Sequence, residues 1–551
     1  MIKEKLQIEI AKILNFSQKD IHLEHPENFS YGDFSTNIAL IKAKELGENP
    51  KKLAESFVAK LSARKLSDVS KIEVAGPGFI NFHLSRDFFA DSIEKIENNK
   101  NFGQNNLYKG KKVMVEHTDP NPFKEFHIGH LMTNTIGESI YRLFDTSGAE
   151  TKNVCYQGDV GLHVAKAIFA KKQKPELPWG AAYKMGSDLY EVYKNEIDEI
   201  NKKIYDKSDS EINKFYESGR KETLQEFEII YKKLGTKFDH YFFESETAIF
   251  GKKMVEEGLG KGIFENSDGA IIYPGEKHGL HTRVFINKFG IPTYEAKDLG
   301  LAKLKYDTFP YDISVSVTGN EINDYFKVVK SALSNIEPEL AKKLEHISHG
   351  MLRLPIGKMS SRKGNVVTAL NFLHNLFDVA KKRASESRVS NSGKIAEQVA
   401  LAAAKYQILK QSPGKDIIFD FDRSISFEGD SGPYLQYTAV RANSVLEKGS
   451  SAGNFLKKIL AGKKKIPSEI TNVERLLYRL PEIIERACKE YAPQYVVTYL
   501  LEVAGAYNAF YGSKQIIGSD YESYYLSITK ATRRVMENGL NVLGIKIPQK
   551  M

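Results

Sequence analysis

Two short segments, far apart in the chain, carry residue types that bind phosphate. The first is HIGH at residues 127–130, and the second is KMSSRKG at residues 358–364. In HIGH, His127 and His130 can donate hydrogen bonds to phosphate oxygens, and Gly129 lets a nucleotide approach the backbone because it has no Cβ. The segment opens a predicted helix, whose unpaired N–H groups attract phosphate. Taken alone, the two histidines are equally well explained as surface residues that cap a helix.

The second segment concentrates positive charge in a predicted loop. Lys358, Arg362 and Lys363 lie among small residues, as a clamp that orders around a phosphate requires. Met359 and Ser360 belong to the same predicted ATP-binding loop. A basic loop alone is usually solvated surface. Its combination with HIGH, within alternating strands and helices, predicts an enzyme in which a carboxylate attacks the α-phosphate of ATP.

That reaction needs neither a covalent enzyme nucleophile nor a dedicated base. The α-carboxyl of an amino acid has a pKa of about 3.3–3.7, so it is already ionised and nucleophilic at neutral pH. What remains is positioning and stabilisation of phosphate charge, which lysines, histidines and ATP-bound Mg²⁺ can provide. Cys155 and Cys488 are the only cysteines, too few for a Cys-rich zinc site. We therefore expect ATP and Mg²⁺, with no zinc and no metal site of the protein itself.

The chain is long enough for several domains. Its 551 residues exceed the roughly 250–300 at which one hydrophobic core stops growing. A polar stretch rich in Asn and Lys ends a small α+β domain, and strand, crossover helix and strand then follow, as in a Rossmann-type parallel sheet. Beyond residue 370 the pattern is almost wholly helical. We predict a multidomain α/β chain with domains at 1–105, 106–370 and 371–551, the second carrying an insertion at about 179–260.

Local patterns predict several elements within these domains. Asn49 is a good cap for a helix that has Pro50 at its first position. The crossover helix that HIGH opens should end at Ser147 and Gly148, and strands are expected near residues 270 and 285. The apolar residues of the crossover helix recur at helical spacing, namely Leu131, Ile136, Ile140, Leu143 and Phe144.

Charge and hydropathy limit the location and partners of the protein. Lys and Arg total 79 against 70 acidic residues, a net charge of +9 that suits a polyanionic partner without requiring one. No apolar run approaches the roughly 18 residues that a membrane span needs, and the first residues form an amphipathic pattern unlike a signal peptide. We expect a cytoplasmic protein that does not bind membranes.

Several stretches resemble the arginyl-tRNA synthetases, a family within the class I aminoacyl-tRNA synthetases. They are YGDFSTNIAL, VAGPGFINF, DPNPFKEFHIGHL, YQGDVGLH, TYEAKDLGLAK, GPYLQYTAVRA and LNVLGIKIPQKM. The resemblance implies ATP-dependent ligation of L-arginine to tRNA-Arg through an arginyl-adenylate, with release of AMP and pyrophosphate. It also implies an N-terminal add-on domain that binds tRNA, a catalytic domain and an all-α anticodon-binding domain. We expect the chain to act as a monomer.

Carried over by position, the resemblance assigns a set of site residues. Those for arginine are Asp119, Asn121, His130, Tyr294 and Asp298, and Glu116 is a second candidate acid for the same site. The residues expected to act in catalysis are Lys124, His127, His130, Lys358 and Arg362. A guanidinium is planar and always charged, so it calls for a carboxylate and can stack on an aromatic ring. Asp298 and Tyr294 supply both. The alternative is that Asp298 caps a helix starting at Leu299.

The chain departs from the family pattern at two positions. Ser361 stands where a second lysine is usual. We expect the ammonium of Lys124, on the HIGH side, to replace the ammonium of that missing lysine. Ile322 stands where a glutamine usually holds the amino end of the substrate, and Asn320, Glu321 or Asn323 could substitute.

The helical region contains residue types suited to splayed anticodon bases. Aromatic rings stack on bases, and arginine meets phosphates or base edges. On this reasoning the predicted tRNA contacts are Tyr434, Gln436, Tyr437 and Arg441. The i, i+3 spacing of the two tyrosines is just as natural for core packing. We assign Tyr507, Phe510 and Tyr511 to the core.

Two rival functions remain. Another class I synthetase, for glutamate or lysine, would share both signatures, although a glutamate pocket would need cationic residues and the proposed ones are acidic. Enzymes for isoleucine, valine or leucine normally carry a large editing domain, because one methylene gives only about 10–200-fold discrimination. This chain has little room for such a domain, which disfavours those enzymes. The other rival is a catalytically silent paralogue that only binds tRNA.

Overall fold

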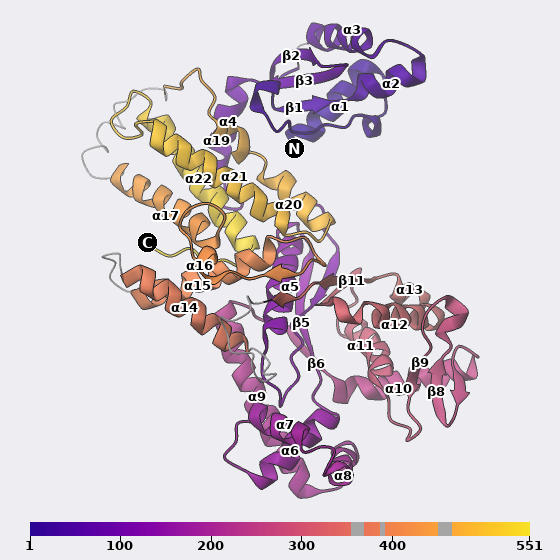
Figure 1. The fold of residues 1–551 in the computed structure, drawn as a ribbon. Coiled ribbons are helices and arrows are strands. Elements are labelled where there is room, and N and C mark those ends of the chain that lie inside the picture. Colours follow the sequence, from indigo (N-terminus) through magenta and orange to yellow (C-terminus); the bar gives the residue numbers. More distant parts are fainter. Residues whose placement is uncertain (65, 354–367, 386–391, 450–464) are drawn as a thin grey trace. The chain divides into compact units, whose positions relative to one another are not determined.

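The computed structural model describes residues 1–64, 66–353, 368–385, 392–449 and 465–551 (Figure 1). The chain divides into two compact units, each built from separate stretches of sequence. Unit 1 contains Met1–Gln104, Tyr437–Ile484 and Thr498–Gly539, and unit 2 contains Asn105–Gln436, Glu485–Val497 and Leu540–Met551.

Unit 2 is built on a five-stranded sheet in the order β11-β10-β4-β5-β6, and every neighbouring pair is parallel. The strands are β4 (Lys112–Glu116), β5 (Glu150–Gln157), β6 (His240–Phe243), β10 (Ile313–Gly319) and β11 (Leu344–His349). The first strand in the chain lies at the centre, and later strands add first on one side and then on the other. This doubly wound order confirms the predicted Rossmann-type domain. It places a crevice where β4 and β10 meet, at the carboxyl ends of the strands.

Helix α5 (Ile128–Thr146) connects β4 to β5 and packs on β4, β5 and β10. Its predicted apolar residues are all buried, namely Leu131, Ile136, Ile140, Leu143 and Phe144. The helix ends at Ser147 and Gly148, as predicted, and Gly148 has a φ of 86° that favours glycine. The sequence around HIGH therefore begins a buried helix at the crevice.

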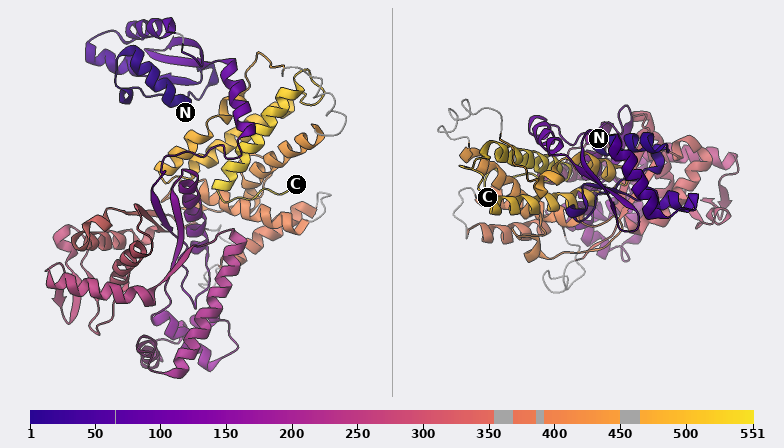
Figure 2. Two further views of the ribbon diagram at one scale, coloured as in Figure 1. Left: turned by 180° about the vertical axis from the view of Figure 1, so that it is seen from behind. Right: turned by 90° about the horizontal axis from the view of Figure 1, so that it is seen from above.

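Two sets of elements interrupt the sheet. Between β5 and β6 lie α6 (Leu162–Gln173), α7 (Trp179–Asp188), α8 (Lys194–Asp206) and α9 (Ser210–Leu234). After β6 come α10 (Glu244–Gly260), β7 (Glu265–Ser267), β8 (Ala270–Tyr273), β9 (Arg283–Ile286), α11 (Tyr294–Thr308), and then, beyond β10, α12 (Asn323–Ile336) and α13 (Pro338–Ala341). In Figure 1, α10–α13 gather with β8 and β9 beside the sheet, and Figure 2 shows the same group from behind.

The sequence-based treatment of 179–260 as one insertion overlooked β6, because its four residues show no alternation. The strands predicted near residues 270 and 285 do form, as β8 and β9, but they belong to a separate antiparallel sheet in which β8 pairs with both β7 and β9. The parallel sheet therefore takes its strands from more widely spaced parts of the sequence than expected.

The rest of unit 2 is mainly helical. It contains α14 (Ala369–Ser385), α15 (Ser392–Leu409), α16 (Phe421–Ser424) and a two-residue pairing of β12 (Leu352–Arg353) with β13 (Ile417–Ile418). Helix α17 (Gly432–Gly449) starts in this unit and continues into unit 1.

Unit 1 combines the N-terminal residues with later helices. Its antiparallel sheet has the order β1-β3-β2, from β1 (Phe34–Thr36), β2 (Val69–Ala75) and β3 (Phe79–Leu84), beside α1 (Ile2–Leu14), α2 (Ile38–Leu46), α3 (Pro50–Ala63) and α4 (Arg86–Asn98). As predicted, the Asn49 side chain caps α3, and Pro50 occupies its first position. The later helices that lie wholly or partly in this unit are α19 (Asn472–Leu477), α20 (Leu480–Lys489), α21 (Gln494–Ser513) and α22 (Glu522–Val542), and the last three continue into unit 2. None of the helices in the described ranges combines the length and hydropathy that a membrane crossing requires.

Candidate active site

A cavity of about 380 Å³ opens at the crevice between β4 and β10. It brings together residues that are up to 228 positions apart in sequence, from β4, β5, β10 and β11 and from α10, α11 and α12. Five of the six residues predicted to bind arginine line it, and they are Glu116, Asp119, Asn121, Tyr294 and Asp298. Only His130 is absent from the lining.

Asp298 lies on the first turns of α11, one turn beyond Tyr294, so both face the same way. The Tyr325 hydroxyl donates a hydrogen bond of 2.6 Å to its Oδ2. Burial raises the pKa of Asp298 to about 8, Glu116 and Glu244 add to the rise, and the Tyr325 bond lowers it. Because α11 begins at Tyr294, Asp298 is not a cap for a helix starting at Leu299, and that alternative is wrong.

Two other carboxylates of the cavity already have cationic partners. Lys305 Nζ lies 2.8 Å from Glu116 Oε2, and Lys297 Nζ lies 2.7 Å from Glu244 Oε2. All four side chains are at least nine-tenths buried. Glu116 is therefore a poor candidate for a free guanidinium acceptor, because its charge is neutralised within the protein.

Sequence reasoning missed several polar lining residues, among them Tyr156, Glu244 and Tyr325. Tyr156 lies near the end of β5, and Glu244 directly follows β6. Recognition of β6 could have identified Glu244, since ligands bind where parallel strands end. No local pattern marks Tyr325, which reaches the cavity from α12.

Asp119 approaches the cavity through an unusual backbone. Thr118 and Asp119 have φ values of 80° and 46°, in the left-handed region that few non-glycine residues adopt. The Asp119 Oδ1 accepts a hydrogen bond of 2.7 Å from the Tyr156 N–H. Burial raises the pKa of Asp119 well above its usual value, and Glu116 raises it further. Such strained backbone, held by a long-range hydrogen bond, is typical of functional sites.

The absence of a side chain at Gly158 leaves room in the cavity for the side chains of Asn121 and Glu244. A Cβ on this residue would lie 2.3 Å from Asn121 Oδ1 and 2.7 Å from Glu244 Oε1. The second oxygen of Glu244, the one not bonded to Lys297, therefore faces Gly158 and Asn121.

The two histidines of HIGH cap α5 by bonding to each other's backbone. His127 Nδ1 accepts hydrogen bonds from the N–H groups of Gly129 (3.1 Å) and His130 (3.4 Å), and His130 Nδ1 accepts one from the His127 N–H (3.2 Å). The rings stack with centroids 3.6 Å apart. Since both Nδ1 atoms are acceptors, both neutral rings carry their proton on Nε2 and can donate from there.

This cap corrects part of the sequence-based reasoning. The N–H groups of Gly129 and His130 are already occupied by His127, so they are not the unpaired anion site that a bare helix start provides. A Cβ on Gly129 would lie 2.9 Å from the His127 ring, so the absence of a side chain there makes room for the imidazole. Burial lowers the pKa of both histidines, and the nearby Lys124 lowers both further.

Lys124 lies on the HIGH side of the cavity. Its ammonium is 5.0 Å from the centre of the Tyr183 ring. Its charge also opposes the rise in pKa that burial gives Glu244. The lysine is therefore close enough to influence both the histidines and the cavity.

Lys358, Met359, Ser360 and Arg362 lie outside the described residues. The first described residue after them, Thr368, forms an antiparallel bridge with His127. The Ala369 N–H also donates a hydrogen bond of 2.9 Å to the Phe126 carbonyl. The chain that follows the second signature therefore pairs with the chain at the first.

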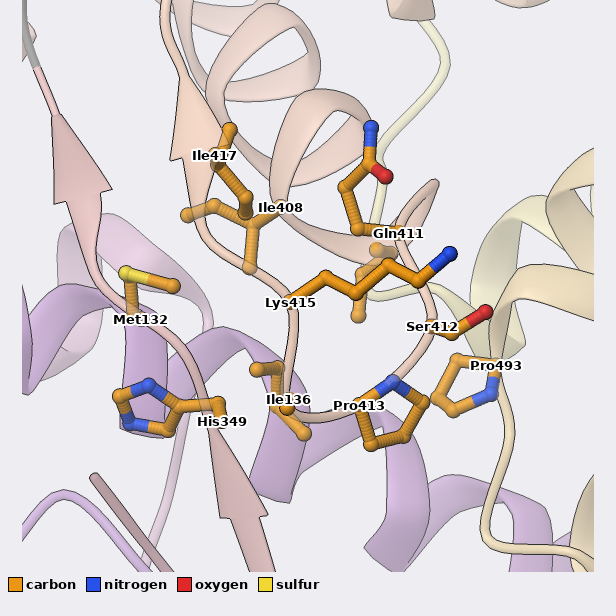
Figure 3. A pocket seen from close by; sticks show the side chains of 12 residues that line it. Met132, Ile136, His349, Ile408, Gln411, Ser412, Pro413, Lys415, Ile417 and Pro493 are labelled. Carbon is orange, nitrogen blue, oxygen red and sulfur yellow. The ribbon is translucent and has the colours of Figure 1, made fainter. Parts of the chain in front are cut away.

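A second, much smaller cavity of about 20 Å³ lies behind α5 (Figure 3). Met132 and Ile136 of α5 face it, together with His349 at the end of β11 and Pro413. It is too small for an amino acid or a nucleotide, so it is a packing defect rather than a substrate site.

The predicted tRNA contacts differ in exposure. Gln436 is fully buried, and its amide donates to the carbonyls of Lys546 (2.6 Å) and Gln398 (3.2 Å). The prediction that Gln436 contacts a base is wrong, because its buried side chain bonds to the backbone near the C-terminus instead. Tyr434 is partly buried in the same helix.

Arg441 lies within unit 1 between two aromatic rings. Its guanidinium is 4.6 Å from the Tyr437 ring and 5.0 Å from the Tyr511 ring, and it donates to Asn508 Oδ1 at 2.6 Å. Tyr511 is 42% exposed, so its assignment to the core was wrong, whereas Tyr507 and Phe510 are buried as predicted. Arg441 is stacked and bonded within the protein, which holds it at a partly exposed surface.

Comparison with known sequences matches nearly the whole chain to described families. Residues 92–421 match "tRNA synthetases class I (R), catalytic domain", 435–551 match "DALR anticodon binding domain", and 1–84 match "Arginyl tRNA synthetase N terminal domain". The chain belongs to the arginyl-tRNA synthetase family. It is 30% identical to the arginine–tRNA ligase of Treponema denticola, over 97% of this chain and 95% of that protein. The ligase of Halothermothrix orenii is also 30% identical, over 98% and 97%.

Solved structures support the fold assignment. The Thermus thermophilus arginyl-tRNA synthetase superposes with a TM-score of 0.81 over 100% of both chains, at 23% identity. The enzyme from Plasmodium falciparum gives the same TM-score over 100% of this chain and 99% of its own, at 20% identity. The chain thus has the fold of these arginyl-tRNA synthetase structures.

Proposed function

We propose that this arginyl-tRNA synthetase ligates L-arginine to tRNA-Arg in the cavity between β4 and β10, with ATP and its bound Mg²⁺ as co-substrates. The observation that carries the assignment is a half-buried acid and an aromatic ring, Asp298 and Tyr294, one turn apart at the switch point of the sheet. A carboxylate acceptor and a stacking surface are what a guanidinium requires.

The distribution of charge in the cavity matches the two cationic groups of arginine. Of the four carboxylates that line it, Glu116 and Glu244 are paired with lysines, whereas Asp119 and Asp298 have no ion-pair partner in the part of the chain that the structure describes. L-Arginine brings a guanidinium and an α-ammonium. We assign the guanidinium to Asp298 and the α-ammonium to Asp119.

This assignment also accounts for Ile322. The isoleucine lines the cavity, so the usual glutamine contact to the amino end is replaced by an apolar surface. Asn320, Glu321 and Asn323, the substitutes considered from sequence, do not line the cavity. Asp119 and Asn121, which also line the cavity, would supply the lost polar contact.

The phosphate chemistry is assigned to the HIGH side. The substrate carboxylate oxygen attacks the α-phosphorus of ATP, the bond to pyrophosphate breaks, and arginyl-adenylate forms. The Nε2–H groups of His127 and His130 and the ammonium of Lys124 would stabilise charge on the phosphates. Lys358 and Arg362, beyond the described ranges, are expected to act on the same phosphates. A ribose hydroxyl at the tRNA terminus then attacks the carbonyl carbon and releases AMP.

The tRNA would contact the N-terminal and helical regions. Tyr434, Tyr437 and Arg441 remain the proposed anticodon contacts, and the exposed Tyr511 beside Arg441 extends this surface. A cytoplasmic monomer remains our expectation.

Aminoacylation of cognate tRNA with each of the common amino acids tests the function. We expect ATP-dependent charging with arginine alone, and a loss of about 100-fold or more in kcat/KM for Asp298→Asn. Asp307→Asn is the matched control, because this exposed aspartate on the same helix pairs only with Lys303 in the described structure. Charging with another amino acid would support a different class I synthetase, and no charging at all would support a silent paralogue.

A further inference from the structure

One lysine lies immediately behind the residues assigned to the guanidinium. Lys297 is 4% exposed, and its Nζ donates to Glu244 Oε2 at 2.7 Å and to Tyr205 Oη at 3.3 Å. The same ammonium is 5.1 Å from the centre of the Tyr294 ring. Glu244 and Tyr294 line the cavity, whereas Lys297 does not. The protein thus places its own cation against the wall that receives the substrate cation.

Lys297 changes how much negative charge this end of the cavity offers. Glu244 lies near enough to Asp298 to raise the pKa of that carboxyl, so the two acids together would form a doubly negative spot. Lys297 neutralises one of them. A substrate cation therefore meets one uncompensated carboxylate, Asp298, together with the remaining oxygen of Glu244 that faces Gly158.

Guanidinium and ammonium respond differently to such a site. An ammonium is compact and strongly hydrated, so it needs concentrated negative charge to offset the loss of its water. A guanidinium is more weakly hydrated and carries donors in a fixed fork, so it can bond Asp298 and Glu244 through separate N–H groups.

We propose that Lys297 is a specificity-determining residue, which makes the cavity accept a guanidino amino acid and reject alkylammonium amino acids such as lysine and ornithine. The inference rests on the proposed assignment of the cavity to arginine. It gives Lys297 a role through charge, without contact to the substrate. The buried ion pair is thus retained for selectivity, since such pairs contribute little net stability.

The test compares substrates within each variant. Pyrophosphate exchange in the presence of tRNA gives kcat/KM for arginine, lysine and ornithine, measured at pH 7.5 and at pH 8.5, where Glu244 without its lysine would ionise more fully. For Lys297→Met we expect the ratio of arginine to lysine to fall by about tenfold or more through a gain for lysine, the effect of one contact to a charged group. Lys297→Arg keeps the charge and should keep the ratio.

Two further variants test whether the change in selectivity depends on Lys297 itself. Lys303→Met, on the exposed side of the same helix, should leave the ratio unchanged. Tyr205→Phe keeps the ring but removes the hydroxyl bonded to Lys297, and it should lower the ratio by a smaller factor, so it carries the test if Lys297→Met does not fold. An unchanged ratio at both pH values, or an equal loss for both substrates, would overturn the proposal. A wild-type enzyme inactive with arginine would instead overturn the proposed function.

Discussion

Arginine affinity should rise with pH, because Asp298 must ionise before it can pair with a guanidinium. Its pKa of about 8 means that about 1% of the carboxyl is ionised at pH 6 and about half at pH 8. If only the ionised form binds, the dissociation constant should be about 50-fold larger at pH 6 than at pH 8. Asp119, whose pKa burial also raises, can only make the dependence steeper.

The sign of the effect follows from the proton balance. A bound guanidinium stabilises the charged carboxylate and lowers its pKa, so binding at pH 7 releases about 0.9 proton from Asp298. Release of protons on binding means that affinity increases as pH rises. The useful window is pH 6–8, since above about pH 8 the α-ammonium of free arginine begins to lose its own proton.

Isothermal titration calorimetry measures both quantities. Titrations of arginine in two buffers with different ionisation enthalpies give the proton count, and a series from pH 6 to pH 8 gives the affinity. Tyr325→Phe removes a hydrogen bond that stabilises the ionised form, so it should shift the rise to higher pH. Affinity that is flat across the window, with no proton release, would refute the assignment of Asp298 as the guanidinium partner.

Three other predictions concern stability. The pKa of Asp298 is higher in the folded chain than its ordinary 3.8, so its contribution to folding stability is complete below about pH 4 and is lost as pH rises to about 8. Asp298→Asn should therefore be more stable than wild type at pH 8. Chemical denaturation should show a gain of up to about 5 kcal/mol in the free energy of unfolding. Gly129→Ala would push a Cβ against the His127 ring and break the helix cap. We expect folding stability to fall by about 1 kcal/mol and activity to fall as well. An unchanged Tm and an unchanged rate would contradict this prediction. Lys305→Met should destabilise by about 3–5 kcal/mol, because it leaves Glu116 buried and unpaired, and adding Glu116→Gln should recover most of it; wild-type stability in the single variant would contradict the pairing.

Local patterns in the sequence predicted the local parts of the fold. The helical spacing from Leu131 to Phe144 identified the buried face of α5, and Asn49 with Pro50 identified the start of α3. These features depend on residues a few positions apart, which periodicity and capping preferences report directly. The cavity could also be anticipated, since parallel strands deliver the residues that follow them to one edge of the sheet.

Pairing between distant residues could not be predicted. Glu116 and Lys305 are 189 residues apart in sequence, and nothing near either position indicates that they neutralise each other. The same holds for Gln436, which looked like a base contact but is buried against the C-terminal residues. Exposure and charge balance depend on how the elements pack, so composition alone misjudged which acids remain available to a substrate.

The measurement that tests the account most directly is a crystal structure of the enzyme with L-arginine bound. We predict that the guanidinium lies within hydrogen-bonding distance of Asp298 and stacks on Tyr294, that the α-ammonium lies at Asp119, and that Lys297 is still bonded to Glu244. Arginine bound in the reverse orientation, or outside the cavity between β4 and β10, would contradict it.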